Sequence, residues 1–180
     1  MLKTFSRPLW GEKKPVKSSY DAVIVGGGLH GLATAYYLAR DFSLTDVAVI
    51  EKKYIGYGGA GRNTAIVRAN QRTKENVPLY KEALDLWPVL TKELDYNLMF
   101  NNCGNLNLLH SEAAVKAARL NITTAQFLGV ESHLMDAQQV HELEPAIYTG
   151  EDITHPIHGA MYHPPGGIVR HDAVVWGLAK

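Results

Sequence analysis

Cysteine is nearly absent from the sequence, since Cys103 is the only one among 180 residues. A disulfide within the chain needs two cysteines, so none can form, and a metal site built from cysteine ligands has no basis. Proteins without disulfides are typical of reducing compartments. We therefore expect a cytoplasmic protein.

An excess of charge of one sign is also absent. Eighteen basic residues balance eighteen acidic ones, and no long run carries a single sign. No apolar run approaches the roughly 20 residues of a membrane-spanning helix, and residues 1–19 lack the apolar core of a signal peptide. We expect no binding to nucleic acid or membrane. Residues 1–19 are basic and contain two prolines, which predicts an irregular arm that either frays or docks on a partner through Leu9 and Trp10.

Glycine, in contrast, is plentiful, and three glycines form the most informative local pattern. The apolar run 22–25 is typical of a buried strand, the segment 32–40 has helical spacing, and the apolar run 47–50 indicates a second strand. Between the first strand and the helix, the pattern G-x-G-x-x-G is formed by Gly26, Gly28 and Gly31. The order strand, glycine turn, helix and strand predicts a βαβ unit.

The chemistry of this unit favours a dinucleotide. Unpaired N–H groups and the positive dipole end at a helix N-terminus attract a pyrophosphate. Gly26 permits the tight turn, Gly28 lets the backbone approach the phosphates, and Gly31 lets the helix pack closely on the strand. Glu51 follows Gly31 by twenty residues, where a carboxylate can accept hydrogen bonds from an unphosphorylated ribose. The alternative is a glycine-rich turn in another kind of α/β protein.

A second glycine-rich segment, 56–63, contains four glycines followed by Arg62 and Asn63. Such a run cannot be a strand or a stable helix interior, but its N–H groups can converge on an anion. It predicts a second ligand-contacting loop; a flexible connection is the alternative.

The rest of the chain mixes strands and helices without an internal repeat. Segments 105–109, 132–134 and 159–162 indicate strands. Ser111 is expected to cap a helix over 111–128, and Asp136 with Gln139 resembles a capping box for a helix that Pro145 ends. A packing helix is predicted over 75–95, with Pro78 near its start, Pro88 as a kink or break, and an apolar face of Leu79, Ala83, Leu86, Trp87, Leu90 and Leu94.

Three histidines lie close together in the sequence, at His155, His158 and His163. Prolines break any regular face here, and no carboxylate completes a ligand set at helical spacing. The pattern favours histidines with local hydrogen bonds, and we expect no metal site.

Several motifs together resemble the FAD-dependent amine oxidoreductases of the D-amino-acid-oxidase type, and within them the β subunits of heterotetrameric sarcosine oxidases. The resemblance begins with 20–39 and is most specific in Gly166-Gly167-Ile168-Val169-Arg170-His171-Asp172-Ala173-Val174-Val175-Trp176-Gly177. It also includes 59–64, 66–68 and 103–106. It implies an α/β fold in which a Rossmann-like FAD-binding βαβ unit is interleaved with part of a mixed-sheet substrate domain. The implied segments are an arm at 1–19, FAD-binding residues 20–75, substrate-domain residues 76–165, and a return to the FAD domain at 166–180.

The resemblance also implies functional residues. Non-covalent FAD would be held at its pyrophosphate and ribose by Gly26, Gly28, His30, Gly31, Glu51 and Lys52, and on its flavin side by Gly59, Arg62, Asn63 and Ile66. Arg68 would pair with a substrate carboxylate, for which its planar fork is suited; a surface arginine is the alternative. His171 would carry covalent FMN, whereas without the resemblance a capping or packing histidine would be expected.

The activity so implied is oxidation of sarcosine to glycine, with electrons passing from FAD to FMN to O2 and forming H2O2. The α, γ and δ subunits of a heterotetramer would be the partners and would provide NAD and tetrahydrofolate sites. The alternatives are an FAD-dependent subunit of a hetero-oligomeric proline, glycine or opine dehydrogenase, and a truncated, non-catalytic fragment. An NAD dehydrogenase is a third alternative, but it gives no reason for the pattern of residues 56–68. Because the sequence stops within a helical pattern, we expect an N-terminal part of a longer protein, inactive by itself.

Overall fold

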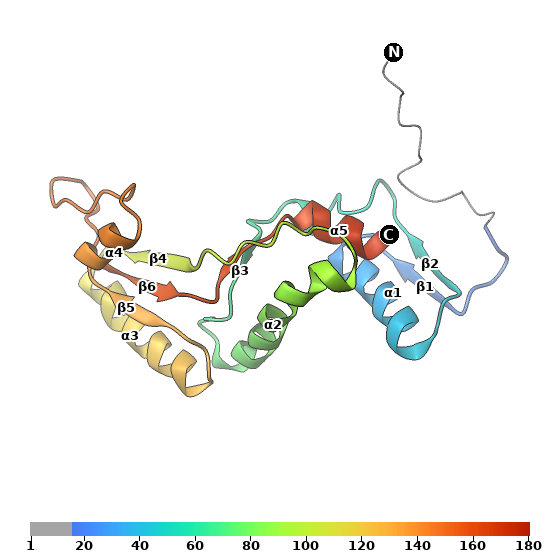
Figure 1. Ribbon diagram of the computed structural model, residues 1–180, viewed down its shortest axis with the longest axis horizontal. Helices are drawn as coiled ribbons and strands as arrows, with labels where there is room; N and C mark the ends of the chain where they lie inside the picture. The colour runs from blue at the N-terminus through green and yellow to red at the C-terminus, as the bar shows by residue number, and fades with distance from the viewer. Residues whose placement is uncertain (1–15) are drawn as a thin grey trace, which may run out of the picture. The chain divides into compact units, whose positions relative to one another are not determined.

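The computed structural model describes residues 16–180 (Figure 1). The expected arm at 1–19, with its docking residues Leu9 and Trp10, therefore lies for the most part outside the described residues. The chain divides into two compact units, with boundaries along the sequence at 63/64 and 170/171. The first unit contains the described residues up to Asn63 together with His171–Lys180, and the second is Thr64–Arg170. The boundaries expected from the sequence were at 75/76 and 165/166.

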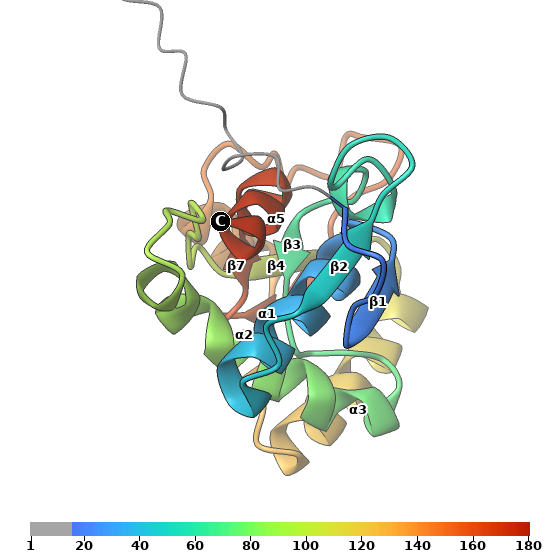
Figure 2. The same ribbon diagram turned by 90° about the vertical axis from the view of Figure 1, so that its right-hand side faces the viewer.

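The first unit is built on the predicted βαβ arrangement. Strand β1 (Ala22–Val25) pairs in parallel with β2 (Val47–Ile50), with Ala22 opposite Val47. Helix α1 (Leu29–Phe42) connects them, as a parallel pair requires. Figure 2 shows α1 beside the two strands. The prediction of two strands and a helix from the apolar periodicity is confirmed.

The last helix, α5 (His171–Ala179), belongs to this first unit. It packs against α1 and against the short 3-10 helix η1 (Gly59–Gly61). Val175 is buried, and a Cβ at Gly56 would lie 3.3 Å from its Cγ1 atom. Because Gly56 also has a φ of +76°, glycine fits both the turn and the close contact with α5.

The second unit contains a three-stranded antiparallel sheet in the order β4 (Asn105–Leu109), β6 (Gly159–His163), β5 (His133–Met135). Helix α3 (Glu112–Phe127) packs on this sheet through a core of Leu109, Ala118, Ile122 and Met161. The Ser111 hydroxyl accepts a hydrogen bond from the Ala114 N–H, as predicted for the cap. The predicted capping box of Asp136 and Gln139 begins α4 (Ala137–Leu143).

A second small antiparallel sheet joins β3 (Ile66–Val67) to β7 (Gly167–Ile168). After β3, the chain continues through the 3-10 helix η2 (Lys74–Asn76) into α2 (Val77–Glu93). A kink or a break was predicted at Pro88; α2 continues through this residue to Glu93, so the break is wrong. No helix among residues 16–180 has both the length and the apolar character needed to cross a membrane.

The expected apolar face of α2 needs a correction. Leu79 and Leu86 are 67% and 40% exposed, whereas Val77 and Leu84 are buried in a cluster with Ala69, Ala125 and Val130. Val77 and Leu84 are each two residues from an exposed leucine, which is about 200° around an α-helix. The predicted residues do lie on one side of the helix, within about 100° of one another, but the first half of α2 buries the opposite side, whereas Leu90 on the expected side is buried.

Candidate functional site

The glycine turn leaves the N-terminus of α1 open. A Cβ at Gly31 would lie 2.0 Å from the backbone oxygen of Gly26, so only glycine allows this packing. At Gly28, the residue that caps α1, a Cβ would meet nothing closer than the Cβ of Ala60 at 3.9 Å. No side chain caps the helix. The first-turn N–H groups therefore remain available to an anionic ligand.

The two glycine segments line one cavity of about 460 Å³. Gly26, Gly28, His30 and Gly31 come from the turn and the first turn of α1, and Gly59 and Asn63 come from the second segment; Val25, Leu29 and Ala60 complete the lining. The side-chain amide of Asn63 donates hydrogen bonds to the backbone oxygens of Gly59 and Ala60, which fixes this loop. Six of the predicted site residues are thus brought together.

Glu51 lies beside the glycine turn but does not line the cavity. Its carboxylate accepts hydrogen bonds from the backbone N–H groups of Gly27, at 2.9 Å, and Lys53, at 3.0 Å. These hydrogen bonds, that from Gly27 foremost, hold the pKa of the Glu51 carboxyl below its usual value. The acid is therefore ionised and oriented at the end of β2. Lys52 follows it as an exposed residue.

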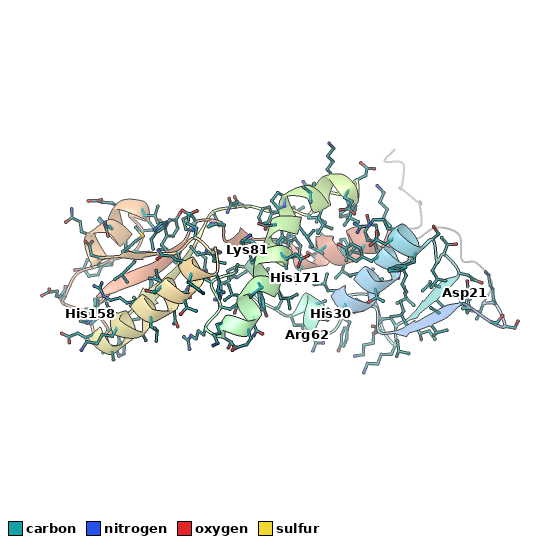
Figure 3. The ribbon with its side chains drawn as sticks, turned by 90° about the horizontal axis from the view of Figure 1, so that it is seen from below. Asp21, His30, Arg62, Lys81, His158 and His171 are labelled. Atoms are coloured by element: carbon teal, nitrogen blue, oxygen red, sulfur yellow. The ribbon has the colours of Figure 1, made fainter. Side chains whose placement is uncertain are left out.

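Arg62 contacts an aromatic ring and does not line the cavity. Its guanidinium lies 4.3 Å from the ring centroid of Tyr57, and Lys53 Nζ donates to the Tyr57 hydroxyl at 2.6 Å. The two cations lower the pKa of Tyr57, Lys53 more strongly. Figure 3 labels Arg62 and His30, which come from separate segments of this unit.

His171 is the first residue of α5 (Figure 3). Its Nδ1 atom is buried and has no hydrogen-bond partner in the described part of the chain. A buried polar atom without a partner costs free energy, and such atoms are rare unless a ligand, water or functional role accounts for them. The His171 ring therefore has one nitrogen that protein contacts leave unused.

Arg68 lines a second cavity, of about 420 Å³, within the other unit. Its Nη1 atom makes only long hydrogen bonds, to the backbone oxygen of Asn70 at 3.3 Å and to Asn70 Oδ1 at 3.4 Å. No carboxylate forms an ion pair with this guanidinium among residues 16–180. A half-buried arginine without an acidic partner is suited to an anionic ligand. Ile66, predicted on the flavin side, also lines this cavity.

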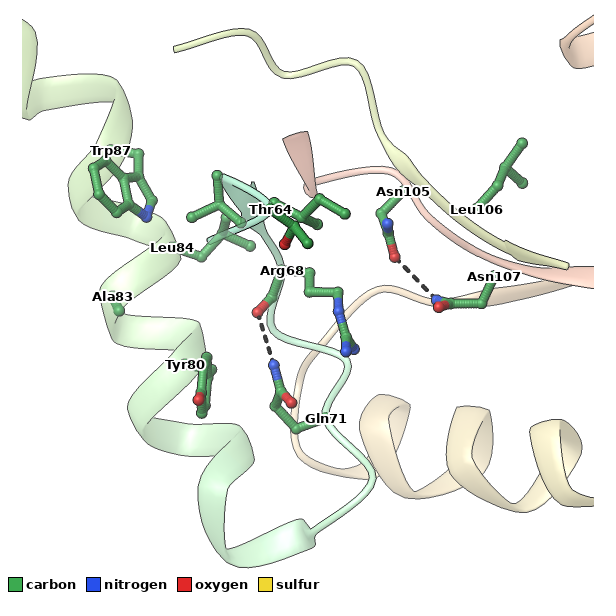
Figure 4. Close-up of a pocket in the computed structure, with 12 residues that line it drawn as sticks. Thr64, Arg68, Gln71, Tyr80, Ala83, Leu84, Trp87, Asn105, Leu106 and Asn107 are labelled. Atoms are coloured by element: carbon green, nitrogen blue, oxygen red, sulfur yellow. Dashed lines mark hydrogen bonds between the residues drawn. The ribbon is translucent and has the colours of Figure 1, made fainter. Parts of the chain in front are cut away.

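The other residues of the Arg68 cavity were not identified from the sequence. Figure 4 shows Arg68 between α2 and the strand that carries Asn105 and Asn107. Helix α2 presents Tyr80, Ala83, Leu84 and Trp87 to the cavity, in the spacing i, i+3, i+4, i+7 of a helix face. Gln71 donates to the Arg68 backbone oxygen at 3.3 Å, and Asn107 donates to Asn105 at 3.0 Å. The two aromatic side chains on this face were the available signal, but the helix was interpreted as packing only.

The histidines of the last third do not converge. The backbone oxygen of His155 bonds to the ring of His110, whereas the ring of His163 is fully buried and bonds to the backbone of Ala69 and Glu131. Among residues 16–180 no group of three potential metal ligands occurs.

Comparison with known proteins identifies relatives. The family model "FAD dependent oxidoreductase" matches residues 21–180. The β subunits of sarcosine oxidase from Arthrobacter sp and Rhizobium meliloti (strain 1021) are 44% and 43% identical to the chain; each alignment covers 96% of the chain and 42% or 41% of the relative. The chain thus spans about two fifths of these relatives.

Solved structures give the same assignment. Glycine oxidase from Geobacillus kaustophilus superposes with a TM-score of 0.78 at 26% identity, covering 89% of this chain and 43% of that one. L-proline dehydrogenase from P. horikoshii superposes with a TM-score of 0.79 at 27% identity, covering 91% and 41%. The predicted Rossmann-like α/β fold is confirmed, and the chain belongs to the family of FAD-dependent oxidoreductases.

Proposed function

We propose that this chain forms the FAD-binding and carboxylate-binding part of a sarcosine oxidase β subunit. The observation that carries the proposal is the guanidinium of Arg68, which lines a cavity with amide and aromatic side chains and has no acidic partner among residues 16–180. Sarcosine is a small amino acid, so its carboxylate is the group by which a protein can orient it. The similarity to sarcosine oxidase β subunits supports this choice of substrate.

The first cavity fits a dinucleotide. The uncapped N-terminus of α1 would hold the pyrophosphate above Gly28, where an added Cβ would occupy the space that the ligand needs. His30, Gly31, Gly59 and Asn63 line the same cavity. Glu51 would bind the ribose through lone pairs that its backbone hydrogen bonds leave free. The assignments of Lys52, Arg62 and Ile66 to FAD rest on the family resemblance.

In the second cavity, Arg68 would bind the substrate carboxylate with two parallel hydrogen bonds and so fix the orientation of the amine. Asn105 and Asn107 offer further polar atoms, and Tyr80 and Trp87 supply apolar surface that excludes water from the substrate. FAD, when bound, would accept the hydride equivalent from the carbon next to the substrate nitrogen.

His171 would carry covalently attached FMN. Its buried Nδ1 has no protein partner in residues 16–180, which fits an imidazole reserved for a ligand. With FMN as the second flavin, O2 would be reduced to H2O2. The proposed α, γ and δ subunits would complete the FMN site and supply the NAD and tetrahydrofolate sites, in the cytoplasm.

A second candidate is an FAD-dependent subunit of a proline or glycine dehydrogenase. It is supported by the similarity to solved structures of L-proline dehydrogenase and glycine oxidase. These substrates also carry a carboxylate, so Arg68 would keep its role. They do not require covalent FMN at His171.

Acid precipitation of the holoprotein separates the two candidates. If the unfolded polypeptide stays yellow and a flavin-modified peptide contains His171, the sarcosine oxidase assignment is supported. Complete release of flavin, together with oxidation of proline or glycine in preference to sarcosine, would favour the second candidate. Oxidation of none of the three would favour a non-catalytic binding module.

A further inference from the structure

His163 connects the three-stranded sheet to the loop that carries Arg68. It is the last residue of β6, is fully buried, and is among the largest fully buried side chains. Its Nε2 atom lies 3.2 Å from the backbone nitrogen of Ala69, and its Nδ1 atom bonds to the backbone oxygen of Glu131. Ala69 and His163 are 94 residues apart in the sequence. The ring therefore joins two distant segments of the second unit.

These two partners fix the protonation of the ring. A backbone N–H can only donate, so Nε2 must accept from Ala69 and carry no proton. A backbone carbonyl can only accept, so Nδ1 must carry the proton and donate to Glu131. His163 is thus a neutral imidazole in the Nδ1–H tautomer. Protonation of Nε2 would set two donors against each other and break the bond to Ala69.

Ala69 is the neighbour of Arg68 in a loop without regular secondary structure. Ala69 and Asn70 are almost completely buried, and Gln71 N–H donates to the Ala69 backbone oxygen at 2.7 Å. The guanidinium of Arg68 makes only the two long hydrogen bonds to Asn70 among residues 16–180. In the described part of the chain, the hydrogen bond from Ala69 to His163 ties this stretch of loop to the β6 strand.

The charged groups that act on His163 are Arg68 and Glu131. Burial is the main cause of a lowered pKa at His163, and the positive charge of Arg68 acts in the same direction. The hydrogen bond to the Glu131 backbone oxygen and the charge of the Glu131 carboxylate both act to raise the pKa of His163, and the carboxylate is also bonded to the ring of His133 at 3.0 Å. Neutral imidazole is the favoured form.

We propose that His163 is a positioning residue for Arg68: its neutral ring holds the Ala69 backbone, and protonation releases the loop and weakens carboxylate binding. The proposal rests on the proposed role of Arg68. It adds a residue that touches no substrate and makes carboxylate binding depend on pH.

Two conservative variants separate the two hydrogen bonds of the ring. In His163→Gln, the side-chain oxygen can reach the position of Nε2 and accept from Ala69. In His163→Asn, the shorter amide reaches only the position of Nδ1 and can donate to Glu131. Both remove the titrating group, but asparagine is one methylene smaller and leaves a larger gap at this buried site. His163→Leu is therefore the packing control, since leucine nearly fills the histidine volume but cannot accept from Ala69; it should behave like His163→Asn if the hydrogen bond is what matters. The probe is methoxyacetate, which keeps the carboxylate but lacks an oxidisable amine, titrated into the holoprotein and followed by the flavin absorbance.

We expect His163→Gln to bind methoxyacetate as the wild type does near neutral pH, and His163→Asn to bind it about tenfold more weakly, the effect of losing one hydrogen bond. In the wild type the affinity for methoxyacetate should fall as the pH is lowered into the range in which the His163 ring becomes protonated. In His163→Gln the affinity should not fall in this range. Hydrogen exchange supplies a readout independent of binding: relative to its intrinsic rate, the Ala69 amide should be protected in the wild type and in His163→Gln but not in His163→Asn.

The outcomes distinguish this inference from the proposed function. If Arg68→Lys weakens methoxyacetate binding but both His163 variants match the wild type or are equally impaired, the positioning role is overturned while Arg68 keeps its own. If Arg68→Lys has no effect on binding, the carboxylate role of Arg68 fails, and the positioning role fails with it. If His163→Asn does not fold, unchanged wild-type affinity and unchanged Ala69 protection at acid pH would overturn the proposal.

Discussion

The carboxylate of Glu51 accepts a hydrogen bond from the backbone N–H of Gly27 at 2.9 Å, which ties the end of β2 to the glycine turn. A Cβ at Gly27 would lie 3.0 Å from the Cβ of Glu51, so the two segments are in close contact. The acid therefore has a structural role as well as its proposed role at the ribose. Its replacement should affect both.

Glu51→Gln keeps one acceptor oxygen but removes the charge. We expect FAD affinity to fall about tenfold, because hydrogen bonds to a charged group are stronger than those to a neutral amide. The pKa of Glu51 is lowered from 4.5 in the folded protein, so its contribution to stability is present above pH 4.5 and is lost as the pH falls through the folded value. The melting temperature of Glu51→Gln should thus depend less on pH in this acid range. An equal acid dependence in both proteins would contradict the role of the Gly27 bond.

Two glycine variants should separate folding from cofactor binding. Gly31→Ala places a Cβ 2.0 Å from the Gly26 backbone oxygen, so we expect a misfolded first unit. Gly28→Ala meets nothing closer than 3.9 Å, so the protein should fold, but the new methyl group projects where the pyrophosphate is expected, and FAD affinity should fall at least tenfold. Circular dichroism and FAD titration measure the two effects.

Gly58→Ala is the matched control, because its added Cβ has no neighbour within 4 Å and it does not line the cavity. Its ψ of −141° lies outside the usual regions for alanine, so circular dichroism checks the folding of this variant too. Normal FAD affinity in Gly28→Ala would show that the ligand does not approach this turn.

Arg68→Lys replaces the planar fork with a single ammonium group. We expect carboxylate binding to weaken about 10- to 100-fold, the effect of losing a charge-assisted hydrogen bond. The loss should appear in KM for the amine substrate and in the affinity for methoxyacetate. Arg119→Lys is the control, since Arg119 is exposed and lines neither of the two cavities that Arg68 lines. Equal effects of the two substitutions would point to a general change in surface charge.

His171→Ser should abolish covalent flavin while leaving non-covalent FAD bound. The hydroxyl cannot replace the imidazole nitrogen as the attachment point, and the dinucleotide cavity is lined by other residues. Flavin fluorescence of the denatured polypeptide on a gel measures the covalent part. His155→Ser is the control, because only the backbone of His155 takes part in a hydrogen bond with His110. Covalent flavin in His171→Ser would place the attachment elsewhere.

Local patterns allowed much of this fold to be predicted from the sequence. The glycine turn, the Ser111 cap and the Asp136 capping box each depend on residues within a few positions of one another. The hydrogen bond from Ala69 to His163 spans 94 residues, so no local pattern could have indicated it. The same holds for the cavity face of α2, where tertiary packing decided which side of the helix was buried. Arg68 and His171 were identified through the family resemblance, because a single arginine or histidine carries no spacing signal.

The most direct test of the account is anaerobic reduction of the flavin by sarcosine in the holoprotein assembled with its partner subunits. We expect sarcosine to bleach the visible absorbance of FAD. Arg68→Lys should shift this reduction to about 10- to 100-fold higher sarcosine concentration, whereas Arg119→Lys should not. FAD that stays oxidised with sarcosine at every concentration, or is reduced equally well by all three proteins, would contradict it.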